Sequence, residues 1–191
     1  AQADDVVAWL RALTARPLPS LGAALCELPV RLPELEFWLP AGALRARELD
    51  ALCRAHLLAS RARPELPART LHGMLMGFAD LVFEHDGRYW VMDYKSNALG
   101  RNDAAYHHDA LEAAMAAHRY DVQAALYLLA LHRLLRARLG AAYAPARQLG
   151  GAIYFFLRGI DGPARGEYFI PPPLALIDAL DAMLAAEEQR A

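Results

Sequence analysis

The sequence is almost without lysine. Lys95 is the only lysine among twenty basic residues, and the other nineteen are arginines. An ammonium group is a compact point charge whose pKa shifts readily with its surroundings, whereas a guanidinium group is planar and stays protonated. A composition that uses arginine everywhere else indicates that position 95 needs an amine, so Lys95 is the first candidate for chemistry.

Other absences narrow the class of protein. Cys26 and Cys53 are too few for a disulfide scaffold and are expected to be reduced thiols. No signal segment and no apolar run of transmembrane length is present, so we expect a cytoplasmic protein with no membrane partner. The phosphate-binding Gly-x-x-x-x-Gly-Lys-[Ser/Thr] loop is missing, which excludes a helicase motor here. Missing His-Glu-x-x-His and paired-cysteine spacings argue against zinc.

The charge is also unlike that of a strongly basic nucleic-acid-binding protein. The formal net charge is −2, so a polyanion would have to be bound locally. Two stretches, 45–69 with six arginines and 119–147 with five, are candidates for flanking a DNA track. For Arg133, Arg136 and Arg138 an equally good interpretation is the solvated face and last turn of a helix, where the helix dipole favours cations.

Residues 81–92 predict a β-hairpin. Two β-rich runs flank Asp86-Gly87, a pair that accepts the positive φ angles of a type I′ turn. A two-residue loop there makes the numbers of paired residues add up to 86 + 87 = 173. The register therefore places Asp80 opposite Asp93.

The hairpin brings three functional groups to one face. Because side chains alternate along a strand, Lys95 shares the face of Asp93. The other face would carry the apolar residues Leu81, Phe83, Trp90 and Met92. Like charges directly opposite each other destabilise a sheet, and two carboxylates suit a hard cation such as Mg²⁺. A solvated hairpin face, with Lys95 merely paired to one acid, is the alternative.

Several motifs resemble one nuclease family. They are Met74-x-x-Gly77-Phe78-Ala79-Asp80, Asp93-Tyr94-Lys95-Ser96-Asn97-x-Leu99-Gly100, His118-Arg119-Tyr120-Asp121-x-Gln123-x-x-Leu126-Tyr127 and Gly150-Gly151-x-Ile153-Tyr154-x-Phe156-Leu157-Arg158-Gly159. In this order they resemble the PD-(D/E)xK nucleases of the restriction-endonuclease-like fold, in particular the RecB-type nuclease domains of bacterial helicase–nucleases. Ala79 stands where the family usually has proline.

The resemblance implies roles for individual residues. Asp80, Asp93 and the Tyr94 carbonyl would hold Mg²⁺, with Mn²⁺ as a substitute and Ca²⁺ binding without supporting cleavage. Lys95 would act on the attacking water or the phosphate, which makes Asp80, Asp93 and Lys95 the catalytic residues. Gln123 and Tyr127, four residues apart and so on one helix face, would contact DNA or support the ligands, although a tyrosine in such a helix is more often core.

Two further positions stay open. Glu36 matches an acid that the family places near the metal, but an ordinary strand glutamate on the wet face explains it nearly as well. The family also takes a histidine ligand from a helix upstream of this chain, so that ligand is missing. His72 is the nearest substitute by sequence, and a structural histidine is the favoured interpretation.

The resemblance further implies a DNA nuclease of the exodeoxyribonuclease V type, acting on single- and double-stranded DNA in break repair and recombination. Its partners would be RecC- and RecD-like subunits and the RecA recombinase. The alternative is a catalytically weak or inactive nuclease-like module that docks DNA or RecA. A third interpretation, a Schiff-base lysine enzyme, would want Lys95 free of adjacent acids, and Asp93 disfavours it.

The order of elements predicts an α/β fold with a central mixed β-sheet flanked by helices. Residues 1–30 would be a helical lead-in left from a longer chain, and residues 31–191 the nuclease domain. Strands are expected at 34–39, 70–76, 151–157 and 167–170 besides the hairpin. Helices are expected at 4–15, 44–58, 104–117 and 120–139, with a last one from Pro171-Pro172-Pro173 to about Gln189.

Overall fold

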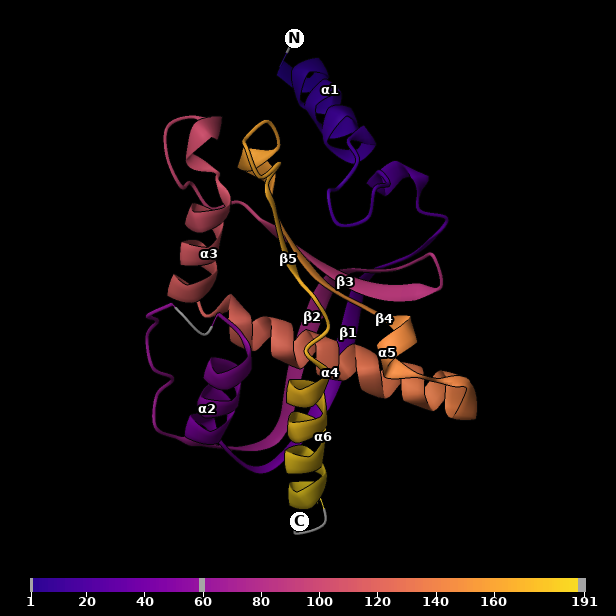
Figure 1. The fold of residues 1–191 in the computed structure, drawn as a ribbon, viewed down its shortest axis with the longest axis vertical. Helices are drawn as coiled ribbons and strands as arrows, with labels where there is room; N and C mark the ends of the chain where they lie inside the picture. Colours follow the sequence, from indigo (N-terminus) through magenta and orange to yellow (C-terminus); the bar gives the residue numbers. More distant parts are fainter. Residues whose placement is uncertain (1, 59–60, 189–191) are drawn as a thin grey trace.

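The computed structural model describes residues 2–58 and 61–188. Its strands are β1 (Val30–Arg45), β2 (Thr70–His85), β3 (Arg88–Lys95), β4 (Leu149–Phe156) and β5 (Glu167–Ile170). Its α-helices are α1 (Gln2–Ala15), α2 (Ala46–His56), α3 (His108–Ala117), α4 (Tyr120–Leu139), α5 (Pro145–Gln148) and α6 (Leu174–Glu188). The strands form one mixed sheet with helices around it (Figure 1), which confirms the predicted fold class.

The sheet has the strand order β1-β2-β3-β4-β5, and only the β3–β4 pair is parallel. The predicted hairpin joins β2 to β3 in the predicted register, from His85↔Arg88 to Leu81↔Met92. Asp86 and Gly87 have φ angles of 51° and 72°, as a type I′ turn requires. The local turn chemistry therefore fixes this part of the sheet.

Strand β1 is much longer than predicted, and β2 joins the strand predicted at 70–76 to the first arm of the hairpin. They pair with each other from Val30↔Glu84 to Arg45↔Thr70 and run on together well past the end of β3 (Figure 1). Pro33 and Pro40 argue against a central strand, but β1 lies at the sheet edge, where a missing N–H is tolerated. We call the part of this pair beyond β3, residues 35–45 and 70–79, the ribbon.

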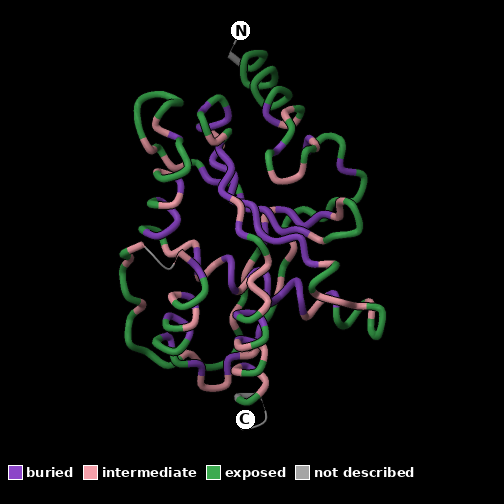
Figure 2. Tube along the Cα trace, in the orientation of Figure 1, coloured by how far each residue is buried: buried purple, intermediate pink, exposed green. Residues whose placement is uncertain are grey.

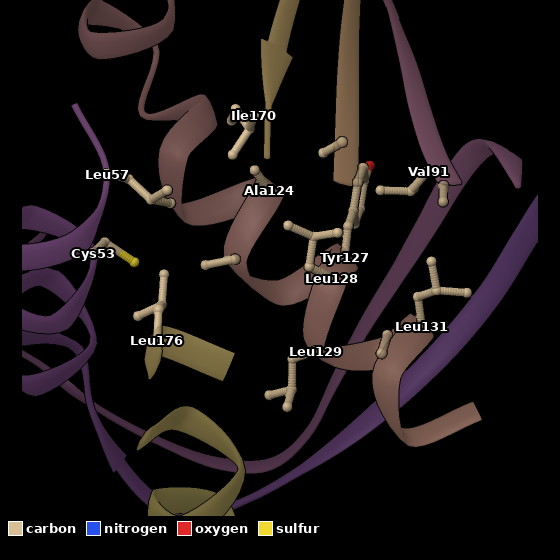
Figure 3. Close-up of a cluster of buried hydrophobic side chains, with 14 of the residues drawn as sticks. Cys53, Leu57, Val91, Ala124, Tyr127, Leu128, Leu129, Leu131, Ile170 and Leu176 are labelled. Atoms are coloured by element: carbon tan, nitrogen blue, oxygen red, sulfur yellow. The ribbon is translucent and has the colours of Figure 1, made fainter. Parts of the chain in front are cut away.

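Two apolar cores cover the two faces of the sheet. The larger lies between the sheet and α4, with α2 and α6 closing it; Figure 3 shows Cys53 and Leu57, Leu176, and the α4 side chains meeting there. The smaller core packs residues of the segment 13–28 against Phe83, Trp90 and Met92. In Figure 2 the buried residues accordingly follow the strands, while most of α1 is exposed.

The predicted helices form with shifted ends. Helix α3 begins at His108 rather than at residue 104 because the His107 side chain caps it, accepting a hydrogen bond from the Ala110 amide at 3.3 Å. Helix α4 has the predicted bounds. The division of the chain at residue 30 stays a prediction. Within the described residues, no helix combines the length and apolarity needed to cross a membrane.

A buried ionic cluster fixes the start of α4. The Asp121 carboxylate is fully buried and lies 2.9 Å from Arg63 Nη1 and 3.0 Å from Arg119 Nε. Arg119 also reaches Asp50 on α2 at 2.6 Å and donates to the Pro64 carbonyl at 2.8 Å. These interactions hold the start of α4 against α2 and the connector before β2, so they also set where the later turns of α4 meet the sheet.

We expect Asp121→Asn to lower the free energy of unfolding by about 3 kcal/mol, because it leaves buried guanidinium groups short of negative charge. Urea unfolding measures this. The matched control is Asp181→Asn, whose carboxylate pairs with Arg133 and Arg136 nearer the surface and should cost about 1 kcal/mol or less. Equal effects of the two substitutions would contradict the structural importance of the cluster.

Candidate active site

The candidate site lies at a fork where β2 separates from β3. The paired ladder ends at Leu81↔Met92, one pair before Asp80 and Asp93. Beyond that point the Tyr94 amide donates to Asp80 Oδ2 at 2.8 Å, so a carboxylate replaces the carbonyl of a continued ladder. Asp80 is therefore held beside Asp93, although the regular pairing stops between them.

Side-chain alternation along β2 breaks at the same place. Ala79 and Val82 both belong to the core on the α4 side, although three residues apart they would lie on opposite faces of a regular strand. The pairing of β1 with β2 also skips the position of Asp80, where Glu34 has a φ of 51°. The break therefore exchanges the two faces of β2. Even-numbered residues face the α4 core in the hairpin, and odd-numbered residues face it in the outer half of the strand.

Asp93 is buried and accepts hydrogen bonds on both oxygens. Its Oδ2 lies 2.6 Å from Lys95 Nζ, and its Oδ1 accepts from Gln123 Nε2 at 3.1 Å and from the Tyr127 hydroxyl at 3.1 Å. Burial raises the pKa of Asp93, Lys95 opposes that rise, and the charge of Asp80 adds to it. The nearby Asp80 thus makes the charged form of Asp93 less favourable, as expected for the two acids that the sequence places close together.

Lys95 contacts two polar and two aromatic side chains. Besides Asp93 it donates to Gln123 Oε1 at 3.0 Å, and its Nζ lies 3.7 Å from the centre of the Tyr120 ring and 5.3 Å from that of Tyr154. Its side chain is only 10% exposed. Aromatic faces attract a cation electrostatically, so the amine is positioned as well as paired.

Helix α4 supplies Gln123 and Tyr127 from one face, as predicted. The Tyr127 hydroxyl accepts from Gln123 Nε2 at 2.7 Å, and its proton is directed toward the Phe78 carbonyl at 2.6 Å and Asp93. Burial raises the pKa of the Tyr127 hydroxyl, and Asp93 adds to the rise, so the group stays a donor. Tyr127 thereby fastens β2 and β3 to the same helix on either side of the fork.

The remaining predicted residues lie elsewhere. Glu36 is exposed on the ribbon and accepts a hydrogen bond from Trp38 Nε1 at 2.9 Å rather than from a group of the site. His72 is bound to the Gly42 carbonyl at 2.7 Å. The part played by Glu36 in metal or DNA binding stays a prediction.

The donors at the fork fit a hard divalent cation. Asp80 and Asp93 are oxygen ligands of the type that Mg²⁺ prefers, and their mutual repulsion is what such an ion would relieve. Over the described residues, no group of three or more His, Cys, Asp or Glu side chains is arranged to hold a metal. Two carboxylates are thus the side-chain donors available at this fork, with the Tyr94 carbonyl predicted beside them.

The side chains that support Lys95 are not predicted by the sequence patterns. Tyr154 Oη donates to the Tyr120 carbonyl at 3.1 Å, and Tyr120 Oη donates to Asn97 Oδ1 at 3.2 Å. Asn97 Nδ2 in turn lies 3.1 Å from His118 Nε2. All four residues stand inside the quoted motifs, so the signal was present, but their mutual interactions depend on the packing of α4 on β3 and β4.

The arginine stretches resolve into paired and unpaired groups. Arg54, Arg61 and Arg63 form ion pairs with acids of the fold, as do Arg119, Arg133 and Arg136. Arg133 and Arg136 pair with Asp181 on α6, so they do not form a purely solvated helix face. Arg45, which pairs with Glu48, lies with Arg47 and Arg69 around a hollow at the far end of the ribbon.

Comparisons with known proteins agree with this geometry. Residues 4–189 match the PD-(D/E)XK nuclease superfamily. The chain is 46% identical over 182 residues to the RecBCD enzyme subunit RecB of Escherichia coli, covering 93% of this chain and 15% of that protein. It is 38% identical to the same subunit of Haemophilus influenzae (92% and 15% covered) and 39% identical to that of Mycobacterium tuberculosis (88% and 18%). The chain thus spans less than a fifth of the length of these relatives.

We expect Asp80→Asn and Asp93→Asn to change stability differently in the absence of divalent ions. Asparagine at position 80 keeps an oxygen for the Tyr94 amide and removes one like charge, so unfolding should need the same or slightly more free energy. Asparagine at position 93 offers one oxygen to three donors and should cost about 1–3 kcal/mol. Urea unfolding in EDTA compares the two, and equal shifts would refute the donor arrangement.

Proposed function

This chain belongs to the PD-(D/E)XK nuclease superfamily, and we propose on that premise that it is a Mg²⁺-dependent DNA nuclease domain of a RecBCD-type helicase–nuclease. One observation carries the proposal. The only lysine of the chain is held between Asp93 and Gln123 at the point where Asp80 meets β3. Two acids and an amine at a diverging strand pair suit hydrolysis of a phosphodiester.

Asp80, Asp93 and the Tyr94 carbonyl would hold the Mg²⁺ ion, with Mn²⁺ as a substitute and Ca²⁺ as a binding but inactive ion. When bound, such an ion polarises a phosphoryl oxygen and lowers the pKa of a coordinated water. Gln123 and Tyr127 keep the Asp93 carboxylate in place through its Oδ1 atom. The Tyr94 amide holds Asp80, so both carboxylates are oriented before substrate arrives, which reduces the reorganisation needed during reaction.

Lys95 acts through its amine. In the ion pair with Asp93 it occupies one carboxylate oxygen, and the Tyr120 ring limits its movement. From this position the ammonium group orients the attacking water or stabilises the charge that builds on the phosphate during in-line attack. Arginine would bring a planar fork into a space shaped around a single nitrogen.

This domain would be one part of a larger multisubunit enzyme. The relatives are subunits of an enzyme named RecBCD, so we propose a cytoplasmic complex with RecC- and RecD-like subunits, acting on single- and double-stranded DNA in repair and recombination. RecA is proposed as a further partner. An activity of the exodeoxyribonuclease V type is part of the same proposal.

The competing function is a nuclease-like module that binds DNA or RecA without cleaving. The ordered interactions around Lys95 favour the nuclease, because a docking module gains nothing from a buried amine with four fitted neighbours. The two functions differ in one product, cleaved DNA. Both permit DNA binding, so binding alone does not distinguish them.

The decisive experiment incubates labelled linear single- and double-stranded DNA with the protein in EDTA, Mg²⁺, Mn²⁺ or Ca²⁺. We expect slow cleavage, in Mg²⁺ and Mn²⁺ only. Both Lys95→Arg and Lys95→Ala should reduce the rate by about 10²-fold or more, the size of effect found when a positioned transition-state donor is removed. Ca²⁺ binding by calorimetry should disappear in Asp80→Asn.

Two controls separate the interpretations. Trp9→Ala changes an exposed side chain of α1 far from the fork in sequence and should leave the rate unchanged. Cleavage by Lys95→Arg at the parental rate would sink the role of a compact amine. If no divalent ion supports cleavage while DNA still binds, the docking module is the correct function.

A further inference from the structure

We propose that the exposed face of the ribbon binds an unpaired single strand of DNA and leads it to the fork; this deepens the proposed nuclease function and rests on it. Four large apolar side chains gather on that face, and we call them the strip. They are Trp38, Met74, Met76 and Phe78, exposed by 54%, 51%, 53% and 49%. Such a patch on a protein surface marks an interaction site.

The register shows that the strip is one continuous surface. Trp38 pairs with Met76, Glu36 with Phe78 and Pro40 with Met74, and paired residues share a face. The alternate positions, among them Leu39 and Ala79, point into the core on the α4 side. The smaller core on the opposite side of the sheet involves residues 81 and 83 of β2 but none of the strip. The strip therefore lies beyond the covered part of the sheet.

The strip leads into the candidate active site. Phe78 lies two residues before Asp80 on the same strand, and its carbonyl is held by Tyr127 at 2.6 Å. Phe78, Met76 and Met74 follow each other at intervals of two residues, about 6.7 Å along a strand. That interval is comparable to the separation of neighbouring bases on an extended, unstacked strand. One base per side chain is thus a geometric match, and the series ends two residues before Asp80.

The chemistry of the strip suits bases. Stacking on aromatic side chains is the usual way in which proteins hold unpaired bases without recognising their sequence. Trp38 is fixed for this purpose because its indole nitrogen donates to Glu36 at 2.9 Å, leaving the ring faces free of that hydrogen bond. Methionine adds a polarisable, adaptable apolar surface.

Positive charge lies at the other end of the same face. Arg45 lies opposite Thr70 in the strand register of the ribbon. These two residues, Arg47 and Arg69 line a hollow of about 330 Å³. Arg45 has Glu48 as partner at 2.8 Å, while Arg47 and Arg69 have no carboxylate partner among the residues that the structure describes. Apolar side chains along the face and cations at its end match the bases and phosphates of one strand. An apolar protein partner would offer these arginines no negatively charged group to bind.

The test is equilibrium binding of a fluorescein-labelled oligothymidylate, followed by anisotropy in EDTA so that no cleavage occurs. We expect Trp38→Ala to weaken binding about tenfold and Trp38→Ala with Met76→Ala to weaken it further. Trp38→Phe should restore most of the affinity, whereas Trp38→Leu, which keeps apolar area but has no ring, should not. Circular dichroism and urea unfolding verify that each variant is folded.

Matched variants separate stacking from charge. Trp9→Ala removes a tryptophan of similar exposure, 42%, from α1 and should leave the affinity unchanged. Arg47→Gln with Arg69→Gln should weaken binding and reduce the slope of log affinity against log salt by about 0.7 for each phosphate that the arginines no longer neutralise. The Trp38 variants should weaken binding without changing that slope.

Unchanged oligothymidylate binding in Trp38→Ala and Trp38→Leu overturns the proposal. So does equal weakening by Trp9→Ala, which would indicate a nonspecific effect. If Trp38→Ala instead converts a self-associating chain to a monomer in sedimentation while DNA binding is unchanged, the strip is a protein interface. Because these measurements need no hydrolysis, their failure leaves the cleavage assay intact, and a cleavage-inactive protein that binds through the strip would refute only the nuclease function.

Discussion

The separation of β2 from β3 beyond the Leu81↔Met92 pair is the constraint on which the rest of the structure depends. If the ladder continued, a backbone carbonyl would bind the Tyr94 amide and Asp80 would be one more strand residue. Because the strands part, the Asp80 carboxylate takes that amide, and the outer half of β2 turns over and continues with β1 alone. A groove of about 590 Å³ lies between the ribbon and α4, beside Gly77, Phe78, Gln123 and Tyr127. Site and ribbon thus have one origin.

Helix α4 stabilises the separated ends of β2 and β3. A diverging strand pair exposes polar groups that need partners, and Tyr127 and Gln123 supply them to Phe78 on one side and Asp93 on the other. The helix can do so only if its first turn is fixed, which is the contribution of the buried Asp121 with Arg63 and Arg119. Burial of such charges is favourable only when every partner is in place, so the ionic cluster and the candidate site are coupled through the body of one helix.

Much of this could be predicted from local chemistry. Asp86-Gly87 determined the turn and hence the register, and the spacing of Gln123 and Tyr127 placed both on one helix face. The single lysine pointed to the amine that the structure surrounds with fitted groups. What local patterns could not give were features decided by distant neighbours. The edge position of β1, which tolerates Pro33 and Pro40, depends on segments far apart in the chain, as does the break in alternation opposite Glu34. So do the rings around Lys95 and the ion pairs of Arg61, Arg63, Arg119, Arg133 and Arg136 with distant acids.

The hydrogen bond from Tyr94 to Asp80 has a spectroscopic consequence. A backbone amide in a sheet normally donates to a carbonyl whose charge never changes, but this one donates to a carboxylate at the centre of the site. Its proton chemical shift and its exchange rate with solvent therefore respond to a cation bound by Asp80. The resonance of this one amide, in the middle of the chain, therefore reports whether the fork is occupied by a cation, without any turnover.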